Sequence, residues 1–220
     1  MKAVVCLPTY NERENLERMV RALGAVLPEG SRVLVIDDNS PDGTGELADG
    51  LARDLGFVDV LHRERKEGLG PAYLAGFRRA LADGADLVLE MDCDFSHDPA
   101  DVPRLIAAAK AGADLVLGSR YVRGGGTGNW GLLRRLISRG ASIYTRVLLM
   151  PVHDATGGFK CFRRHVLESI DLETIDAAGY VFQVETTYRA LRKGFSVVEV
   201  PIHFVDRREE IGRASCRERV

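Results

Sequence analysis

Several features that define large classes of proteins are missing from this chain. Its 220 residues include only four cysteines, which lie far apart and form no C-x-x-C pair, so neither a zinc site nor a disulfide framework is expected. No run of about 18 apolar residues occurs, which excludes a membrane-spanning helix. The net charge of −2 gives no general case for binding nucleic acid. Residues 1–2 lead directly into an apolar stretch, so we expect no signal peptide and a cytoplasmic protein with reduced thiols.

Two common nucleotide-binding patterns are also missing. No G-x-G-x-x-G follows the first apolar stretch and no G-x-x-x-x-G-K-[ST] occurs, which excludes the usual dinucleotide and P-loop sites. Acidic residues are absent between Asp114 and Asp154, while the same interval holds six arginines: Arg120, Arg123, Arg134, Arg135, Arg139 and Arg146. This basic block favours a partner that carries phosphate or an anionic surface, although a solvated helix face is the commoner origin of a charge run.

The chain instead alternates short apolar strands with amphipathic helical segments. We expect strands at residues 3–7, 32–37, 58–61, 87–91 and 115–118, separated by helices at 15–26, 44–55, 72–83 and 100–111. This rhythm predicts an α/β fold with a mainly parallel, Rossmann-like sheet and helices on both faces. After residue 121 the rhythm changes, and we expect a long helix at 131–150, a strand at 159–162, a helix at 183–193 and a strand at 197–204.

The strand predicted at residues 87–91 is followed by two carboxylates, Asp92 and Asp94. Side chains two residues apart on a strand share a face, and open α/β sheets bind ligands at the C-terminal ends of their strands. Two hard oxygen ligands suit Mg²⁺ or Mn²⁺, which proteins hold through one or two carboxylates and the phosphates of a substrate. A solvated turn or a helix cap is the simpler interpretation of so short a pair. Its place after a buried strand favours a metal-assisted reaction on a phosphorylated substrate.

Polar residues also follow the first two predicted strands, at residues 8–12 (PTYNE) and 37–44 (DDNSPDGT). The carboxylates of Glu12 and Asp38 can accept hydrogen bonds from the N–H and O–H groups of a base or a ribose. Ser40, Asp42 and Gly43 are more typical of a turn and a helix cap. Because parallel strands end at one edge of a sheet, these groups are expected to share a site with the carboxylate pair.

These motifs resemble the family-2 inverting glycosyltransferases of the glycosyltransferase A fold, and are most similar to the polyprenol (dolichol) phosphate mannose synthases among them. The resemblance extends over residues 2–209. It is carried by residues 8–12, 37–43, 91–94 (MDCD), 118–121 (GSRY), 124–126 (GGG), 130, 154–160 (DATGGFK), 180–185 (YVFQVE) and 201–207 (PIHFVDR).

The resemblance implies an enzyme that transfers mannose from GDP-mannose to the phosphate of a polyprenol, with Mg²⁺ or Mn²⁺. The residues that would hold the nucleoside are Pro8, Tyr10, Glu12, Ile36 and Asp38. Asp92 and Asp94 would hold the metal on the diphosphate, with the backbone of Cys93 beside them.

The resemblance also assigns the phosphate contacts. Arg120 and Arg207 would meet phosphate groups, and Asp94 and Arg120 are the predicted catalytic residues. Arginine suits this role because its planar fork donates two parallel hydrogen bonds to a phosphate. Many relatives that glycosylate hydroxyl groups carry an aspartate as general base, whereas the matching residues 182–185 (FQVE) contain none. A phosphate acceptor needs no base, since its second pKa near 6 leaves it largely dianionic at pH 7.

We therefore expect a single glycosyltransferase domain at residues 1–209, with a nucleotide-sugar-binding half at 1–121, an acceptor half at 122–209 and an atypical or truncated tail at 210–220. The predicted partners are GDP-mannose and a polyprenyl phosphate in a membrane, with a separate membrane-anchor protein as an open question.

The arginines at 131–150 alternate with apolar residues, which fits either an interfacial helix or a basic helix packed on the sheet. The first option places the chain peripherally on the cytoplasmic face of a membrane.

Three other functions remain open from the sequence. The nearest is the same reaction with a different sugar, as in a polyprenyl-phosphate glucosyltransferase. A nucleotide-sugar-binding module without catalysis is the second, because a fold does not guarantee a function. The third is a nucleotidyltransferase, although the chain has no Gly-rich triphosphate loop after its first strand.

Overall fold

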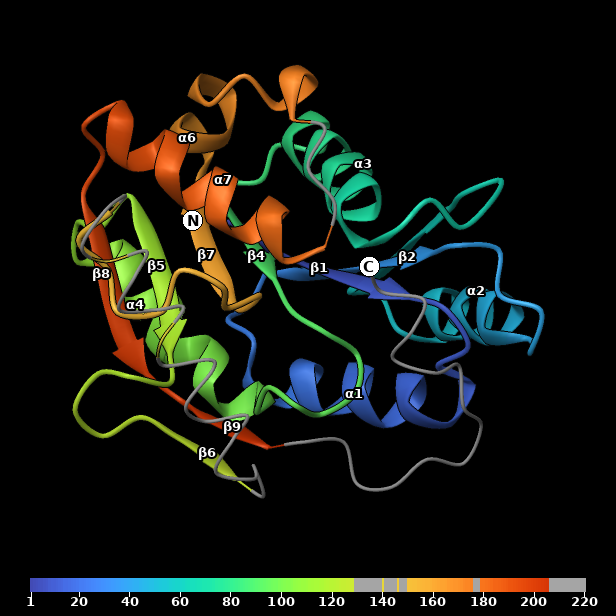
Figure 1. Cartoon of the computed structure of the whole chain (residues 1–220). Helices are drawn as coiled ribbons and strands as arrows, with labels where there is room; N and C mark the ends of the chain where they lie inside the picture. Colours follow the sequence, from blue (N-terminus) through green and yellow to red (C-terminus); the bar gives the residue numbers. More distant parts are fainter. Residues whose placement is uncertain (129–139, 141–145, 147–149, 176–178, 206–220) are drawn as a thin grey trace.

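The computed structural model describes residues 1–128, 140, 146, 150–175 and 179–205, which form a central sheet with helices on both sides (Figure 1). Seven strands of the described chain lie in the order β3-β2-β1-β4-β7-β5-β8. They are β1 (Ala3–Thr9), β2 (Arg32–Asp37), β3 (Val58–His62), β4 (Leu87–Glu90), β5 (Leu115–Ser119), β7 (Lys160–Arg163) and β8 (Val197–Pro201). All neighbouring pairs are parallel except the two that involve β7, which confirms the predicted mainly parallel sheet.

Helices cover both faces because successive residues of each strand point to opposite sides. In β1, Val5 and Leu7 belong to one buried cluster, whereas Val4 and Cys6 belong to another. The first cluster includes residues of α1 (Arg13–Val26), α2 (Thr44–Asp54) and α4 (Val102–Lys110). The second includes residues of α3 (Leu69–Ala82), α6 (Arg164–Ser169) and α7 (Tyr180–Arg192). The prediction of helices on both faces is therefore confirmed.

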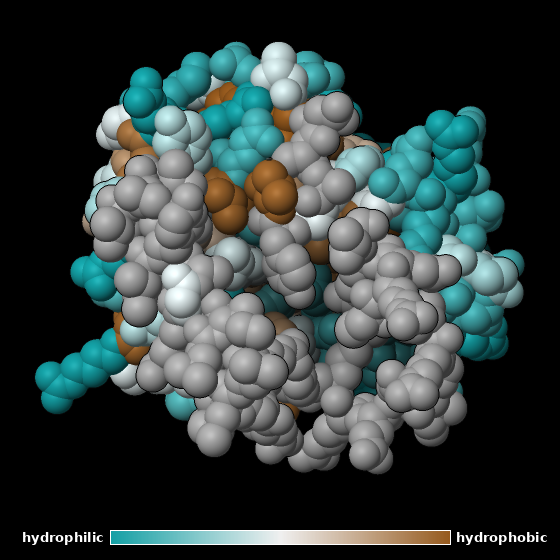
Figure 2. All heavy atoms as spheres, in the orientation of Figure 1, coloured by the Kyte–Doolittle hydropathy of each residue, from teal (hydrophilic) through white to brown (hydrophobic). Residues whose placement is uncertain are grey.

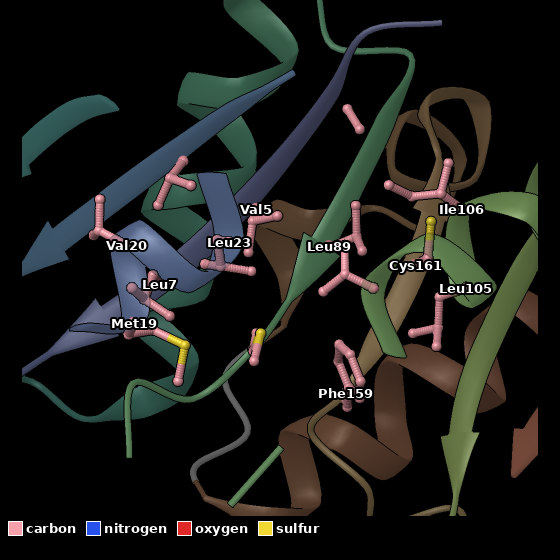
Figure 3. Packing of buried hydrophobic residues seen from close by; sticks show 14 of the residues in the cluster. Val5, Leu7, Met19, Val20, Leu23, Leu89, Leu105, Ile106, Phe159 and Cys161 are labelled. Carbon is pink, nitrogen blue, oxygen red and sulfur yellow. The ribbon is translucent and has the colours of Figure 1, made fainter. Parts of the chain in front are cut away.

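Helix α1 shows how the sequence fixes this packing. Its apolar residues Leu16, Met19, Val20 and Leu23 recur at the spacing of one helix face, and all four are fully buried. Figure 3 shows three of them, Met19, Val20 and Leu23, beside the side chains of β1. Burying each such side chain contributes about 1.5–3 kcal/mol, so this face holds α1 firmly on the sheet.

Two predicted strands end differently in the structure. The strand predicted at 197–204 is wrong as a single element, because it divides into β8 and β9 (His203–Val205). Pro201 lies opposite Ser119, where β5 ends, and beyond it the chain pairs with β6 (Gly126–Gly128) in a second sheet. The strand predicted at 87–91 ends at Glu90, so both metal-binding candidates lie in the following loop rather than on one strand face.

The helix predicted at 131–150 lies outside the described residues, apart from residues 140, 146 and 150, and stays a prediction. Over the described ranges, no helix combines the length and the apolar character needed to cross a membrane. Figure 2 shows hydrophilic side chains over the part of the surface where α2 lies in Figure 1.

Candidate functional site

Four strands of the same direction deliver polar residues to one edge of the sheet. β2, β1 and β4 are neighbours, and β5 lies beyond the antiparallel β7. The backbone N–H of Asp38, just after β2, donates to the carbonyl of Thr9, the last residue of β1, at 3.0 Å. The loops that follow these strands therefore begin side by side at the C-terminal edge, where open α/β sheets bind their ligands.

Asp38 is buried beside an arginine that the sequence motifs do not include. Its Oδ1 accepts a hydrogen bond from Nη1 of Arg63 at 2.6 Å, and only 8% of the Asp38 side chain and 11% of the Arg63 side chain are exposed. Burial raises the pKa of Asp38, and the hydrogen bond from Arg63 opposes that rise. Arg63 directly follows β3, so its place after a strand is the signal that could have identified it.

Tyr10 and Glu12 lie in the loop between β1 and α1. The Nζ of Lys66 is 4.1 Å from the centre of the Tyr10 ring, within the range of a cation–π contact. The backbone N–H of Glu12 donates to Oγ1 of Thr44 at 3.1 Å, and its Oε2 accepts from Nδ2 of Asn15 at 2.8 Å. These contacts fix the loop against the neighbouring helix termini.

Pro8 and Ile36 pair with each other inside the sheet. The Ile36 side chain is fully buried against α3, where a Cβ added at Gly76 would lie 2.4 Å from its Cδ1. Pro8 lies beyond Cys6, the last residue of β1 that pairs with β4, so its missing N–H breaks no hydrogen bond of that pairing. The Ile36 side chain thus belongs to the core, and a nucleoside contact by these two residues stays a prediction.

The two carboxylates predicted to hold a metal lie in the loop after β4, and both are partly exposed. Oδ1 of Asp92 accepts from the hydroxyl of Tyr73 in α3 at 3.4 Å. Oδ1 of Asp94 accepts from the backbone N–H of Ser96 at 3.0 Å. Each carboxylate is therefore oriented by a neighbouring group at the open edge of the sheet.

A buried histidine, absent from the sequence predictions, supports this loop. The backbone N–H of Asp92 points at Nδ1 of His97 at 3.5 Å. Burial lowers the pKa of His97 to about 4, so its ring is neutral at pH 7 and can accept. The ring stacks on Phe159 with centroids 5.1 Å apart. Phe95, between Asp92 and His97 in the chain, adopts the left-handed conformation that is uncommon for residues other than glycine, with φ of 57°. The loop turns at this residue.

Arg120, predicted to meet phosphate, is held by an acidic residue of a neighbouring loop. Its Nε and Nη2 donate to the two carboxylate oxygens of Asp154 at 2.7 and 2.6 Å, and Nη2 also donates to Oγ1 of Thr156. Only 9% of the Arg120 side chain and none of the Asp154 side chain are exposed. Glu199 of β8 in turn accepts the N–H of Asp154 at 3.0 Å. The arginine fork is thereby fixed in position.

A further buried pair of ionisable side chains lies in the sheet, where β4 ends just before the carboxylate loop. Glu90 of β4 and Lys160 of β7 are cross-strand partners, and both are fully buried. Nζ of Lys160 donates to the carbonyl of Gln183 at 2.6 Å and to Oγ1 of Thr186 at 3.0 Å, which ties β7 to α7. The Gln183 side chain and the charge of Lys160 both oppose the rise in the pKa of Glu90 that burial causes. Burial raises the pKa of Glu90 to about 7 and lowers that of Lys160 to about 8.

The family model described as glycosyl transferase family 2 matches residues 4–171. The chain belongs to glycosyltransferase family 2. Among its relatives, a polyprenol monophosphomannose synthase from Mycolicibacterium smegmatis is 50% identical over 97% of this chain and 81% of its own length. An undecaprenyl-phosphate mannosyltransferase from Micrococcus luteus is 47% identical over 97% of this chain and 87% of its own length.

Solved structures agree with this assignment at the level of the fold. The glucosyl-3-phosphoglycerate synthase of Mycobacterium tuberculosis, solved with Mn²⁺, uridine diphosphate and glucosyl-3-phosphoglycerate, superimposes with a TM-score of 0.71. The match covers 96% of this glycosyltransferase and 72% of the other chain, at 22% identity. The glycosyltransferase A fold predicted from the motifs is confirmed.

The predicted site residues of this glycosyltransferase divide into two groups. Those at the ends of β1, β2, β4 and β5 come to one edge of the sheet, whereas Arg207 lies outside the described residues. Within the described ranges, no three or more His, Cys, Asp or Glu side chains gather as a ready metal site. The pair Asp92 and Asp94 nevertheless fits Mg²⁺ or Mn²⁺, which bind through one or two carboxylates and complete their coordination with substrate phosphates.

Proposed function

We propose that this glycosyltransferase transfers mannose from GDP-mannose to the phosphate of a polyprenol, with Mg²⁺ or Mn²⁺ bound. The observation that carries the proposal is the 50% identity, over 97% of the chain, with a relative named polyprenol monophosphomannose synthase. The second relative is named undecaprenyl-phosphate mannosyltransferase. Both names join mannose to a polyprenyl phosphate.

On the donor side, the loops after β1 and β2 would bind the nucleoside through Pro8, Tyr10, Glu12, Ile36 and Asp38. Asp92 and Asp94, with the Cys93 backbone, would hold the metal ion on the diphosphate. The bound ion would supply Lewis-acid stabilisation of the leaving diphosphate. Two contacts of Asp92 support this role, because the Tyr73 hydroxyl donates to its carboxylate and His97 faces its backbone N–H, so the residue is positioned before a substrate arrives.

On the acceptor side, residues 182–185 offer no carboxylate that is poised as a general base. Phe182 and Gln183 are buried, and the carboxylate of Glu185 is paired with Arg189 at 2.5 Å. A phosphate monoester suits this arrangement, since it is already largely dianionic at pH 7 and needs positive charge beside it. We assign that task to Arg120 and Arg207, with Asp94 and Arg120 as the catalytic residues.

A lipid-linked acceptor also implies contact with a membrane surface. We infer a peripheral position on the cytoplasmic face, supported by the acid-free interval between Asp114 and Asp154 with its six arginines. Co-sedimentation with vesicles tests the inference, and an equal affinity for neutral and anionic lipid would contradict it.

The metal assignment is tested by comparing Asp94→Asn with Asp98→Asn in transfer of mannose from GDP-mannose to a polyprenyl phosphate. Asp98 lies in the same loop and accepts the N–H of Ala100 at 2.9 Å, a contact that asparagine keeps. We expect Asp94→Asn to lower transfer about a hundredfold or more and Asp98→Asn to leave it nearly unchanged. Equal activity of the two variants would contradict the metal site. In the same assay with the wild type, faster transfer from UDP-glucose than from GDP-mannose would favour a glucosyltransferase.

A further inference from the structure

We propose that Glu199 of β8 is a positioning residue for the acceptor phosphate, because it fixes the backbone from which Asp154 holds the Arg120 guanidinium. The inference rests on the proposed function, in which Arg120 meets the phosphate of the polyprenol. Glu199 lies outside every motif that carries the family resemblance, and it belongs to a strand rather than to a loop of the site.

Glu199 reaches the site from a neighbouring strand. β8 runs parallel to β5, and the two strands lie side by side at one end of the sheet (Figure 1). Glu199 pairs with Leu117, and Arg120 follows Ser119, the last residue of β5. Paired residues of adjacent strands share a face of the sheet, so Glu199 lies on the face where Leu117 joins a buried cluster. Only 11% of the Glu199 side chain is exposed.

Both oxygens of the Glu199 carboxylate accept hydrogen bonds from the loop after residue 152. Oε1 accepts the backbone N–H of Asp154 at 3.0 Å, and Oε2 accepts the backbone N–H of His153 at 2.9 Å. Nδ1 of His153 lies 2.7 Å from the same Oε2. Two successive backbone donors thus meet two acceptor oxygens, a pair that only an ionised carboxylate offers among side chains. A glutamine would turn its amino group toward one of the two donors.

Asp154 passes this constraint to the arginine. Its side chain is fully buried and accepts from Arg120 three times, from the backbone N–H at 2.9 Å, from Nε at 2.7 Å and from Nη2 at 2.6 Å. The loop is also closely packed, because a Cβ added at Gly157 would lie 3.2 Å from the carbonyl oxygen of Gly118 and 3.6 Å from the Asp154 carboxyl carbon. A shift of the Asp154 backbone would therefore move the guanidinium with it.

The chemistry of the transfer explains why the position of the guanidinium matters. An oxygen of the acceptor phosphate forms a bond to the anomeric carbon of mannose as the bond from that carbon to the diphosphate of GDP breaks. A misplacement of about 1 Å in such an arrangement can cost about a hundredfold in rate. The planar fork of arginine donates two parallel hydrogen bonds to a phosphate only in the correct orientation. The placement of Arg120, as well as its charge, thus decides how well the acceptor is held.

The test compares Glu199→Gln with Asp114→Asn in mannose transfer to polyprenyl phosphate and in calorimetric titration with GDP and Mg²⁺. Asp114 is a matched control at the opposite end of the same two strands. Its carboxylate accepts the N–H and the hydroxyl of Ser196, each at 2.9 Å, and contacts Nε2 of His165. We expect Glu199→Gln to raise KM for polyprenyl phosphate about fivefold or more and to leave the affinity for GDP within about twofold of the wild type. Asp114→Asn should leave both quantities within about twofold.

A second comparison asks whether Glu199 acts through Arg120. Arg120→Lys keeps a positive charge beside Asp154 but loses the planar fork. In that background, Glu199→Gln should change KM for polyprenyl phosphate less than about twofold, because the effects of residues that act through one another do not add. An equal rise in KM in the wild-type and Arg120→Lys backgrounds overturns the inference.

The outcomes separate the two proposals. A wild type that transfers no mannose to polyprenyl phosphate overturns both. If the wild type does transfer mannose, two results overturn the role of Glu199 and leave the proposed function standing. One is a loss confined to GDP affinity, and the other is an unchanged KM, even with fewer GDP sites per chain, which is the mark of a merely structural residue.

Circular dichroism checks that the variants fold. If Glu199→Gln is unfolded, Glu199→Asp decides, because aspartate keeps both acceptor oxygens and the charge but is one methylene shorter. That variant should raise KM for polyprenyl phosphate about threefold or more, and an unchanged KM overturns the inference.

Discussion

Replacing Lys160 by methionine tests the buried pair between Glu90 and Lys160 most sharply. Methionine keeps the length and apolar stem of lysine but removes its charge and its hydrogen bonds to Gln183 and Thr186. Removing one partner of a buried ion pair costs about 3–5 kcal/mol when the other charge stays buried. Because Glu90 can take up a proton instead, the cost should depend on pH.

The direction of this pH dependence follows from the raised pKa of Glu90, which is about 7 in the folded chain against an ordinary value of 4.5. A carboxyl group whose pKa is raised by folding stabilises the fold fully at pH values below its ordinary pKa. This contribution is lost as the pH rises through the pKa of the folded state. The charge of Lys160 lowers the pKa of Glu90, so the variant pKa lies higher still. At about pH 6, Glu90 is mostly protonated in both proteins, and the variant loses only hydrogen bonds, about 1–3 kcal/mol.

As the pH rises through about 7, Glu90 ionises in the wild type, whereas in the variant its ionisation is shifted to higher pH. The destabilisation should therefore grow as the pH rises above about 7, by an amount on the order of 1 kcal/mol. Urea unfolding followed by circular dichroism at several pH values measures it. Lys193→Met, which removes a half-exposed lysine 3.3 Å from Asp171, is the control and should cost under about 0.5 kcal/mol. A pH-independent loss, or a Glu90→Gln/Lys160→Met double variant no more stable than Lys160→Met, would refute the reasoning.

Two further changes probe other parts of the fold. Asp154→Asn removes the negative charge that pairs with the buried Arg120, so we expect a loss of about 3–5 kcal/mol in unfolding free energy. An unchanged melting temperature would show that the pair is not structural. Leu23→Ala opens a cavity under the fully buried face of α1 and should cost about 2–5 kcal/mol in the same measurement. Val181→Ala, at a side chain 62% exposed, is its control and should stay within about 0.5 kcal/mol of the wild type.

The strand–helix alternation was predictable because it follows from local patterns. The face of α1 that carries Met19 and Leu23 is visible in the helical spacing, and alternation in β1 assigns Val5 and Cys6 to opposite faces. The sequence could not show that β7 runs antiparallel between β4 and β5, since strand order depends on long-range pairing. It also could not show that β8 ends at Pro201, because that end depends on where β5 stops.

The site was predictable where a residue follows a strand in a recognisable motif, as with Asp38 and Asp92. Residues that act on those groups from other elements were missed. Arg63 contacts the Asp38 carboxylate and Lys160 faces that of Glu90, each from another segment of the chain, while His97 faces the backbone N–H of Asp92 from within the same loop. No local pattern marks such contacts. The pairing of Arg120 with an acidic residue 34 positions away likewise depends on the fold.

The central claim, mannose transfer to a polyprenyl phosphate, is tested most directly by following label from GDP-[¹⁴C]mannose into organic-extractable lipid. The assay contains a polyprenyl phosphate with Mg²⁺ or Mn²⁺. We predict label in the lipid phase that depends on the acceptor and disappears with EDTA. Binding of GDP-mannose without any transfer to the lipid, with either metal ion, would contradict the account.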